Sequence, residues 1–232
     1  MTGVIDVIWR IASVSWPGTV TAIVGAPFFL FVLRTALPPV DSLHGRRLVA
    51  LRRLGKRIAF GFDGDRWLVL HLMIAGRLQW ADAGTTPKAV NVLTHFRFAS
   101  GTLTLTEAGT KRRAALHVVE GETGLDLHNP GGIDVLACSL AEFTAALQRE
   151  NHTLKRSLTD PHLFSGIGNA YSDEILHEAG LLPFRKRSTL APEEVDALYA
   201  ATRMVLARAE AVLRERVPPA FETEGRDFLA VH

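Results

Sequence analysis

Cysteine is almost absent from this chain of 232 residues, which has one, Cys138. A single cysteine excludes an intramolecular disulfide and any zinc site built from several cysteines. Such low usage fits a protein of the reducing cytoplasm. Cys138 lies in the apolar string VLACSL, and we therefore expect it to be a small, buried hydrophobic side chain.

The chain also lacks a strong excess of charge of either sign. Its formal net charge is +2, so the places where basic residues gather matter more than their total. They gather in three separate clusters, at 46–57, 111–113 and 185–187. One such cluster alone is more typical of a solvated turn, but three of them suit a surface that follows a phosphate backbone.

Charge is missing altogether between Ile11 and Leu33. A run of this length is compatible with a membrane span. Serine, threonine, proline and glycine residues interrupt the run, which favours buried strands, and no A-x-A cleavage site follows a short apolar core. We therefore expect a cytoplasmic protein without membrane association, and a protein anchored by this run is the alternative.

Patterns typical of strands dominate residues 1–130. Thr102–Thr106 alternates strictly, which predicts one buried face, and Asp63-Gly64 is a hairpin turn signal. A second hairpin turn is expected at Ser100-Gly101. The other predicted strands are apolar or β-rich runs, at 20–24, 28–32, 57–62, 67–72 and 96–98. Together they predict an antiparallel β-sandwich.

The string Asn129-Pro130-Gly131-Gly132 breaks the strand pattern and sets the predicted boundary between domains of residues 1–130 and 131–232. Beyond it, Leu140–Arg149 is predicted to be helical. Another helix is predicted to begin at Pro192, because proline and the acidic residues behind it suit a first helical turn. The fold class expected is α+β, with the sandwich followed by a helical domain.

Residues 151–183 carry the strongest functional signal, in the string NHTLKRSLTDPHLFSGIGNAYSDEILHEAGLLP. Gly166-Ile167-Gly168-Asn169 directly precedes a helical pattern, and Asn169 is the expected N-cap. Free N–H groups and the positive end of the helix dipole make such a turn a phosphate site, and Lys155 and Arg156 add charge. Without other signals, such a turn is more often a plain connection between helices.

The whole string closely resembles the helix–two-turns–helix signature of the formamidopyrimidine-DNA glycosylase / endonuclease VIII family. Three further stretches are similar to that family: LVALRRLGK at 48–56, HLMIAGRL at 71–78 and TEAGTKRR at 106–113. The resemblance implies an enzyme of base excision repair, a DNA glycosylase and abasic-site lyase that cleaves by β-elimination. Its partner would be double-stranded DNA with a damaged base or an abasic site, bound by a monomer in the nucleoid.

The resemblance also implies roles for particular residues. Turning a base out of the duplex costs a few kcal/mol, which phosphate contacts and a side chain filling the gap must offset. Ile74 stands where the family usually has the gap-filling methionine, although a core position is an equal alternative. A phosphate contact and a structural role are equally weighted for His71. The residues matching the family's DNA contacts are Lys56, His71, Arg113, Lys155 and Asn169, and Lys56 is also expected near the reacting sugar.

The chain departs from the family at both ends. The family's nucleophile is an N-terminal proline followed by glutamate, whereas Thr2 and Gly3 stand here. We expect the α-amine of Thr2, with a reference pKa of about 8, to replace the proline, and Asp6 to replace the carboxylate. The family's four-cysteine zinc hairpin would begin near His232, so we expect no metal or other cofactor. A DNA-binding relative without activity is the alternative to an active enzyme.

Overall fold

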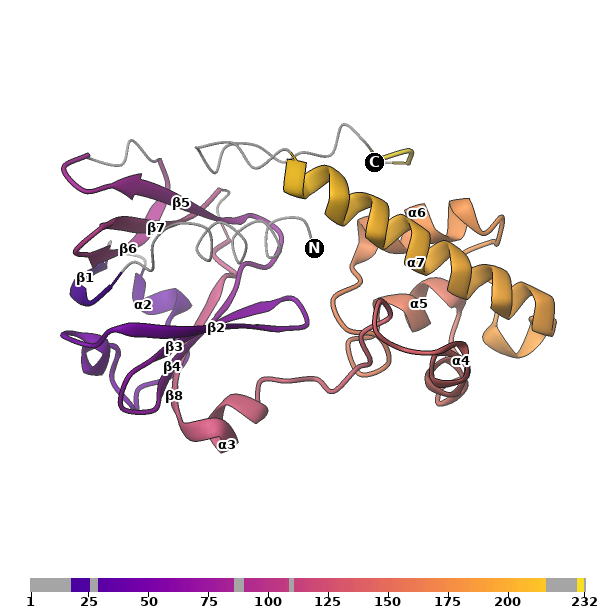
Figure 1. The fold of residues 1–232 in the computed structure, drawn as a ribbon, viewed down its shortest axis with the longest axis horizontal. Coiled ribbons are helices and arrows are strands. Elements are labelled where there is room, and N and C mark those ends of the chain that lie inside the picture. The colour runs from indigo at the N-terminus through magenta and orange to yellow at the C-terminus, as the bar shows by residue number, and fades with distance from the viewer. Residues whose placement is uncertain (1–17, 26–28, 86–89, 109–110, 216–228, 232) are drawn as a thin grey trace. The chain divides into compact units, whose positions relative to one another are not determined.

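The structure is a computed structural model that describes residues 18–25, 29–85, 90–108, 111–215 and 229–231. These residues form two compact units, and Asn129 is followed by the first described residue of the second unit, Pro130. Figure 1 labels the helices and strands of both units. The predicted residues Thr2 and Asp6 lie outside the described residues.

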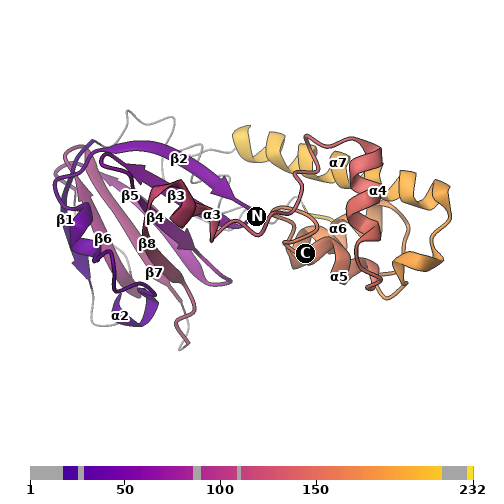
Figure 2. The same ribbon diagram turned by 90° about the horizontal axis from the view of Figure 1, so that it is seen from below.

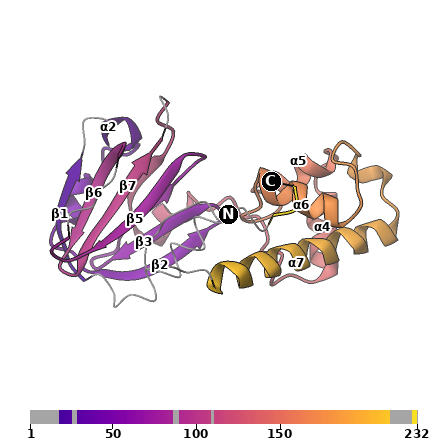
Figure 3. The same cartoon turned by 90° about the horizontal axis from the view of Figure 1, so that it is seen from above.

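The first unit contains two four-stranded antiparallel sheets, which Figures 1 and 3 show face to face. The strand orders are β1-β6-β7-β5 and β2-β3-β4-β8. The strands are β1 (Val20–Gly25), β2 (Leu48–Leu54), β3 (Arg57–Phe62), β4 (Arg66–His71), β5 (Gly76–Asp82), β6 (Val92–Phe98), β7 (Gly101–Glu107) and β8 (Ala115–Glu120). The predicted antiparallel β-sandwich is thus confirmed.

Strand alternation gives the second of these sheets two different faces. On β3, Ile58 and Phe60 pack into the core between the sheets, whereas Ala59 belongs to a separate cluster on the opposite side. The short helix α3 (Gly121–Asp126) covers part of that outer side, where its Leu125 packs against Trp67. Figure 1 shows α3 on the side of this sheet away from the other sheet.

One prediction for the sandwich is wrong. The apolar run at 28–32 was expected to be a strand, but Phe29–Val32 forms the short helix α2, with Phe29 and Val32 buried. Periodicity cannot distinguish a strand from a helical turn in so short a run.

The alternation in Thr102–Thr106 predicted one buried face, which Leu103 and Leu105 form, and Thr104 and Thr106 on the opposite face of β7 are buried as well. No helix among the described ranges is long and apolar enough to cross a membrane.

The second unit is helical, with a single apolar core. Figure 2 shows α7 as its longest helix, passing α4 and α6. The elements are α4 (Leu140–Gln148), α5 (Leu154–Thr159), α6 (Asn169–Glu178), η2 (Arg187–Thr189) and α7 (Pro192–Glu215), while the sandwich adds η1 (Val40–Leu43). Both predicted helices are present, and α4 begins with a capping box between Ser139 and Glu142.

Cys138 lies at the edge of this core and is half-buried, so its predicted full burial is wrong. It directly precedes the α4 N-cap, which keeps it near the surface. Its carbonyl accepts a hydrogen bond from the Tyr199 hydroxyl at 2.8 Å, which ties the start of α4 to α7. Burial is the main cause that raises the pKa of its thiol. Cys138 is therefore a packing residue at neutral pH.

Candidate nucleic-acid interface

Lys56 lies in the tight turn between β2 and β3, where Gly55 has a φ of +61°. Burial lowers the pKa of Lys56, and the positive charge of Arg57 lowers it further. The lysine thus stands in the turn between two strands, directly before β3. A partly buried amine in a cationic surrounding is a good partner for an incoming phosphate.

His71, the last residue of β4, pairs in register with Arg57 on β3. Burial, followed by the charges of Arg57 and Lys56, lowers the pKa of His71 to about 4. The imidazole is therefore neutral at pH 7 and offers one N–H donor. A phosphate bound beside it would stabilise the protonated form and raise this pKa. The sheet thus brings Lys56 and His71 together, as two groups suited to the same anion.

The turn between β4 and β5 presents two apolar side chains to solvent. Met73 is 44% exposed and Ile74 is 74% exposed, so the alternative of a core position for Ile74 is wrong. Met73 has a φ of +55°, a left-handed conformation that costs energy for a side chain of this kind. The Ile74 carbonyl accepts a hydrogen bond from Arg77 Nη1 at 3.0 Å. The turn thus presents exposed apolar side chains of the kind that can act as a wedge between bases.

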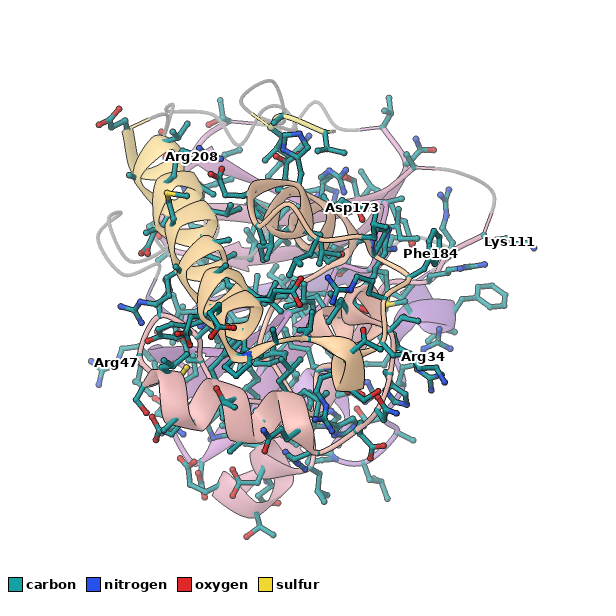
Figure 4. The ribbon with its side chains drawn as sticks, turned by 90° about the vertical axis from the view of Figure 1, so that its right-hand side faces the viewer. Arg34, Arg47, Lys111, Asp173, Phe184 and Arg208 are labelled. Carbon is teal, nitrogen blue, oxygen red and sulfur yellow. The ribbon has the colours of Figure 1, made fainter. Side chains whose placement is uncertain are left out.

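The loop that follows β7 carries exposed basic side chains above a buried carboxylate. Glu107, only 1% exposed, accepts hydrogen bonds at Oε1 from the backbone N–H groups of Arg113 at 2.8 Å and Ala114 at 3.1 Å. Arg113 is therefore fixed at its backbone while its side chain is exposed. Figure 4 shows Lys111, from the same loop, extending into solvent.

In the helical unit, the glycine turn leads into α6 with one difference from the prediction. Gly168, extended with ψ of −176°, is the N-cap, and Asn169 is the first helical residue. The Gly168 carbonyl accepts the first helical hydrogen bond, from Ser172 N at 2.9 Å. No side chain caps this end of α6. The side-chain amide of Asn169 is exposed and has no hydrogen bond to any described residue.

Lys155, on α5, forms an ion pair that the sequence did not reveal. Its Nζ lies 2.7 Å from Oδ1 and 2.9 Å from Oδ2 of Asp173 on α6. Its backbone N–H donates to the Pro183 carbonyl at 3.2 Å. These contacts bring Lys155 to the helix that begins at Asn169. Asp173 is labelled in Figure 4.

The family resemblance implies a zinc site. The family's zinc site needs four cysteines, and the half-buried Cys138 is the one cysteine of this sequence. Among the described residues, no group of three or more His, Cys, Asp and Glu side chains is placed to hold a metal ion. The residues present do not fit that zinc site.

Comparison with protein families gives two matches. The description "Formamidopyrimidine-DNA glycosylase N-terminal domain" matches residues 32–116, and "Formamidopyrimidine-DNA glycosylase H2TH domain" matches residues 134–216. The two domains of one family therefore match, in order, the sandwich and the helical unit. This chain belongs to the formamidopyrimidine-DNA glycosylase family.

Relatives carrying the family name agree with this result. The formamidopyrimidine-DNA glycosylase of Heliobacterium modesticaldum is 34% identical over 172 residues, which are 72% of this chain and 62% of that protein. The enzyme of Moorella thermoacetica is 35% identical over 169 residues, 71% of this chain and 61% of that protein. The chain thus spans about three fifths of the length of these relatives.

Solved structures share the fold. Lactococcus lactis Fpg in complex with DNA containing an abasic site superposes with a TM-score of 0.81 at 19% identity, over 91% of this chain and 78% of that one. The complex of the same protein with DNA containing FAPY-dG gives a TM-score of 0.80 at 20% identity, over 90% and 79%. The family's fold is therefore present in both described units.

Proposed function

We propose that this chain is a DNA-repair glycosylase that binds double-stranded DNA at a damaged base or an abasic site. One observation carries the proposal: the uncapped N-terminus of α6, which presents the exposed and unbonded amide of Asn169 behind a glycine turn. Backbone N–H groups and the helix dipole favour a phosphate at such an end. The family membership of the chain supports the same choice of ligand.

Further DNA contacts are proposed in each unit. Lys155 adds positive charge next to α6, reduced by its pairing with Asp173. In the sandwich, Lys56 and His71 are proposed to bind backbone phosphates, and the exposed Arg113 is proposed as a further DNA contact. Ile74, and Met73 beside it, would fill the space left by a base turned out of the stack, which offsets a cost of a few kcal/mol.

For the reaction we propose the lyase chemistry implied by the family. The α-amine of Thr2, freed by removal of Met1, would attack C1′ of the damaged nucleotide and displace the base, which leaves with a proton. Opening of the C1′–O4′ bond would give the Schiff base, and loss of a C2′ proton with departure of the 3′ phosphate would then cleave the strand by β-elimination. Asp6 is proposed to move the protons. Lys56, with its lowered pKa, is proposed to lie close to the reacting sugar. No metal or organic cofactor is needed for these steps.

Borohydride trapping on an abasic-site duplex tests this proposal, using protein with an untagged N-terminus. Reduction of the Schiff base should leave a covalent adduct that maps to Thr2. A matched variant, Thr2→Pro, restores the family's secondary amine and should increase the yield of adduct. If neither protein forms an adduct although both bind abasic DNA, the chain is a DNA-binding member of the family without lyase activity.

A further inference from the structure

The outer face of the β2-β3-β4-β8 sheet carries a group of basic side chains outside the interface already described. Strand alternation turns Ile58, Leu70 and Leu116 toward the core, so Arg57 and His117 emerge on the other side. The register Val69↔His117 and Arg57↔His71 places them on neighbouring rows of one face.

His117 is stacked on His128, which follows α3. Their ring centroids are 4.4 Å apart with planes tilted by 47°. The backbone N–H of His128 donates to the Leu125 carbonyl at 3.0 Å, which fixes the residue at the end of that helix. Neither imidazole forms a hydrogen bond within the described part of the chain. Two half-buried imidazole rings thus lie in contact, and the N–H donors of both are available to a ligand.

Arg57 is the most unusual member of the group. Burial lowers the pKa of its guanidinium, yet this side chain has no hydrogen bond or ion pair with the described residues. A charge removed from water without a partner is costly. Arg52 on the same face shows the ordinary solution, since its Nη1 lies 2.6 Å from Glu122 Oε2.

The described acidic side chains near this face interact with other arginines, not with Arg57 or the two histidines. Glu122 and Asp126 of α3 act on Arg52, and Glu120 pairs with Arg66. A further basic residue lies next to β8. The backbone N–H of Arg34 donates to the Leu116 carbonyl at 2.8 Å, which places this arginine beside His117. Arg34 is exposed and labelled in Figure 4.

The electrostatic surroundings of the two histidines agree with this arrangement. The pKa of His117 is lowered to about 4 by burial first, then by His128, Arg57 and Arg34. Burial and Arg57 also lower the pKa of His128. Every charged group that acts on His117 is thus basic, and Lys56 and His71 lie farther along the same face. An anion at this place would relieve the repulsion between these groups.

We propose that Arg57, His117 and His128, with Arg34 beside them, form a phosphate-binding site on the outer face of the sandwich. The two guanidinium groups supply fixed charge, and the imidazole rings supply N–H donors. The phosphate is either part of the backbone of bound DNA or a free phosphate group. The first source rests on the proposed function, whereas the second does not.

Proton NMR of the histidine rings in the full chain tests the site. Inorganic phosphate, compared with chloride at equal ionic strength, should raise the pKa values of His117 and His128 by about one unit, a tenfold tighter binding of the anion to the protonated ring. Arg57→Gln should abolish this increase. Arg52→Gln, a paired arginine on the same face, is the matched control and should preserve it.

A second titration with an abasic-site duplex separates the two sources. If the DNA backbone is the source, the duplex should shift the same two histidines, and Arg57→Gln should reduce the salt dependence of binding by about one phosphate contact. If free phosphate is the source, only inorganic phosphate should shift them and DNA affinity should not change. Signals of His117 and His128 that respond to neither probe would overturn the site.

The two proposals fail separately. Loss of DNA binding in Asn169→Ala tests the interface at α6 and does not involve Arg57. Conversely, the phosphate titration is carried out without DNA, and its result stands whether or not the chain cleaves abasic sites.

Discussion

Basic side chains have acidic partners in both units of this protein, Arg52 with Glu122 in the sandwich among them, but one group of basic side chains in the sandwich does not. In the helical unit, several basic side chains have acidic partners: Lys155 with Asp173, Arg185 with Glu194, and Arg208 with Glu178. On the outer face of the sandwich, by contrast, Arg57, His71 and His117 have no acidic partner among the described residues. The helical unit is therefore expected to recognise phosphate through a helix end and a neutral amide, and the sandwich through basic groups that no carboxylate balances.

Buried carboxylates complete this comparison. Among the described residues, each unit has one buried glutamate whose oxygens accept backbone N–H groups, Glu107 in the sandwich and Glu174 in the helical unit. Glu174 accepts from Ala230 N at 2.8 Å and Val231 N at 2.6 Å. Glu107 does the same for the loop of Arg113. In both units a buried carboxylate thus fixes the position of a nearby backbone segment.

The largest effect is expected for Glu107→Ala. The substitution leaves buried N–H groups of Arg113 and Ala114 without an acceptor, which should lower the free energy of unfolding by about 2–3 kcal/mol. Urea unfolding measures this loss. Glu122→Ala, an exposed partner of Arg52, is the control and should change stability by less than about 1 kcal/mol. Equal effects of the two substitutions would show that Glu107 does not hold the loop.

An effect of pH is also expected, through His71 and His117. Both have a pKa of about 4 in the folded chain, below the ordinary value of about 6.5, so the unfolded chain binds protons first as the pH falls. Stability should be fully present above pH 6.5 or so and be lost progressively toward pH 4. Urea unfolding of His117→Gln should show a weaker dependence over this window. An unchanged dependence would mean that the ring is not held neutral by its surroundings.

The smallest effect is expected for the ion pair of the helical unit. Asp173→Asn replaces the carboxylate beside Lys155 with a neutral side chain of the same size. The positive charge of Lys155 then becomes fully available to a phosphate. Affinity for an abasic-site duplex should rise about threefold at low salt, an increment of well under 1 kcal/mol that is typical of exposed pairs. Fluorescence anisotropy measures it. Weaker binding would show instead that Asp173 positions Lys155 for DNA.

Local pattern was enough to predict the sandwich hairpins and the helices at Leu140 and Pro192, because turn residues and periodicity lie close together in sequence. Family resemblance supplied Lys56 and His71, and the sheet brings both to one end. The N-cap of α6 was predicted at Asn169, one residue late, because glycine is also accepted at an N-cap, although asparagine is preferred there.

Other features depend on contacts between distant residues. The pairing of Lys155 with Asp173 arises because α5 and α6 pack together, and no local pattern marks it. The stack of His117 on His128 requires α3 to fold back over the sheet. The exposure of Ile74 follows from the β4–β5 turn, whereas a short apolar sequence is equally compatible with a core position. Burial of this kind is decided by tertiary packing.

The central claim is that the uncapped end of α6 binds a DNA phosphate through Asn169. Its most direct test compares the affinity of the full chain and of Asn169→Ala for an abasic-site duplex, over a series of salt concentrations. The account predicts about tenfold weaker binding by the variant, or about 1.4 kcal/mol, with an almost unchanged salt dependence because the amide is neutral. Equal affinity of the two proteins would contradict it.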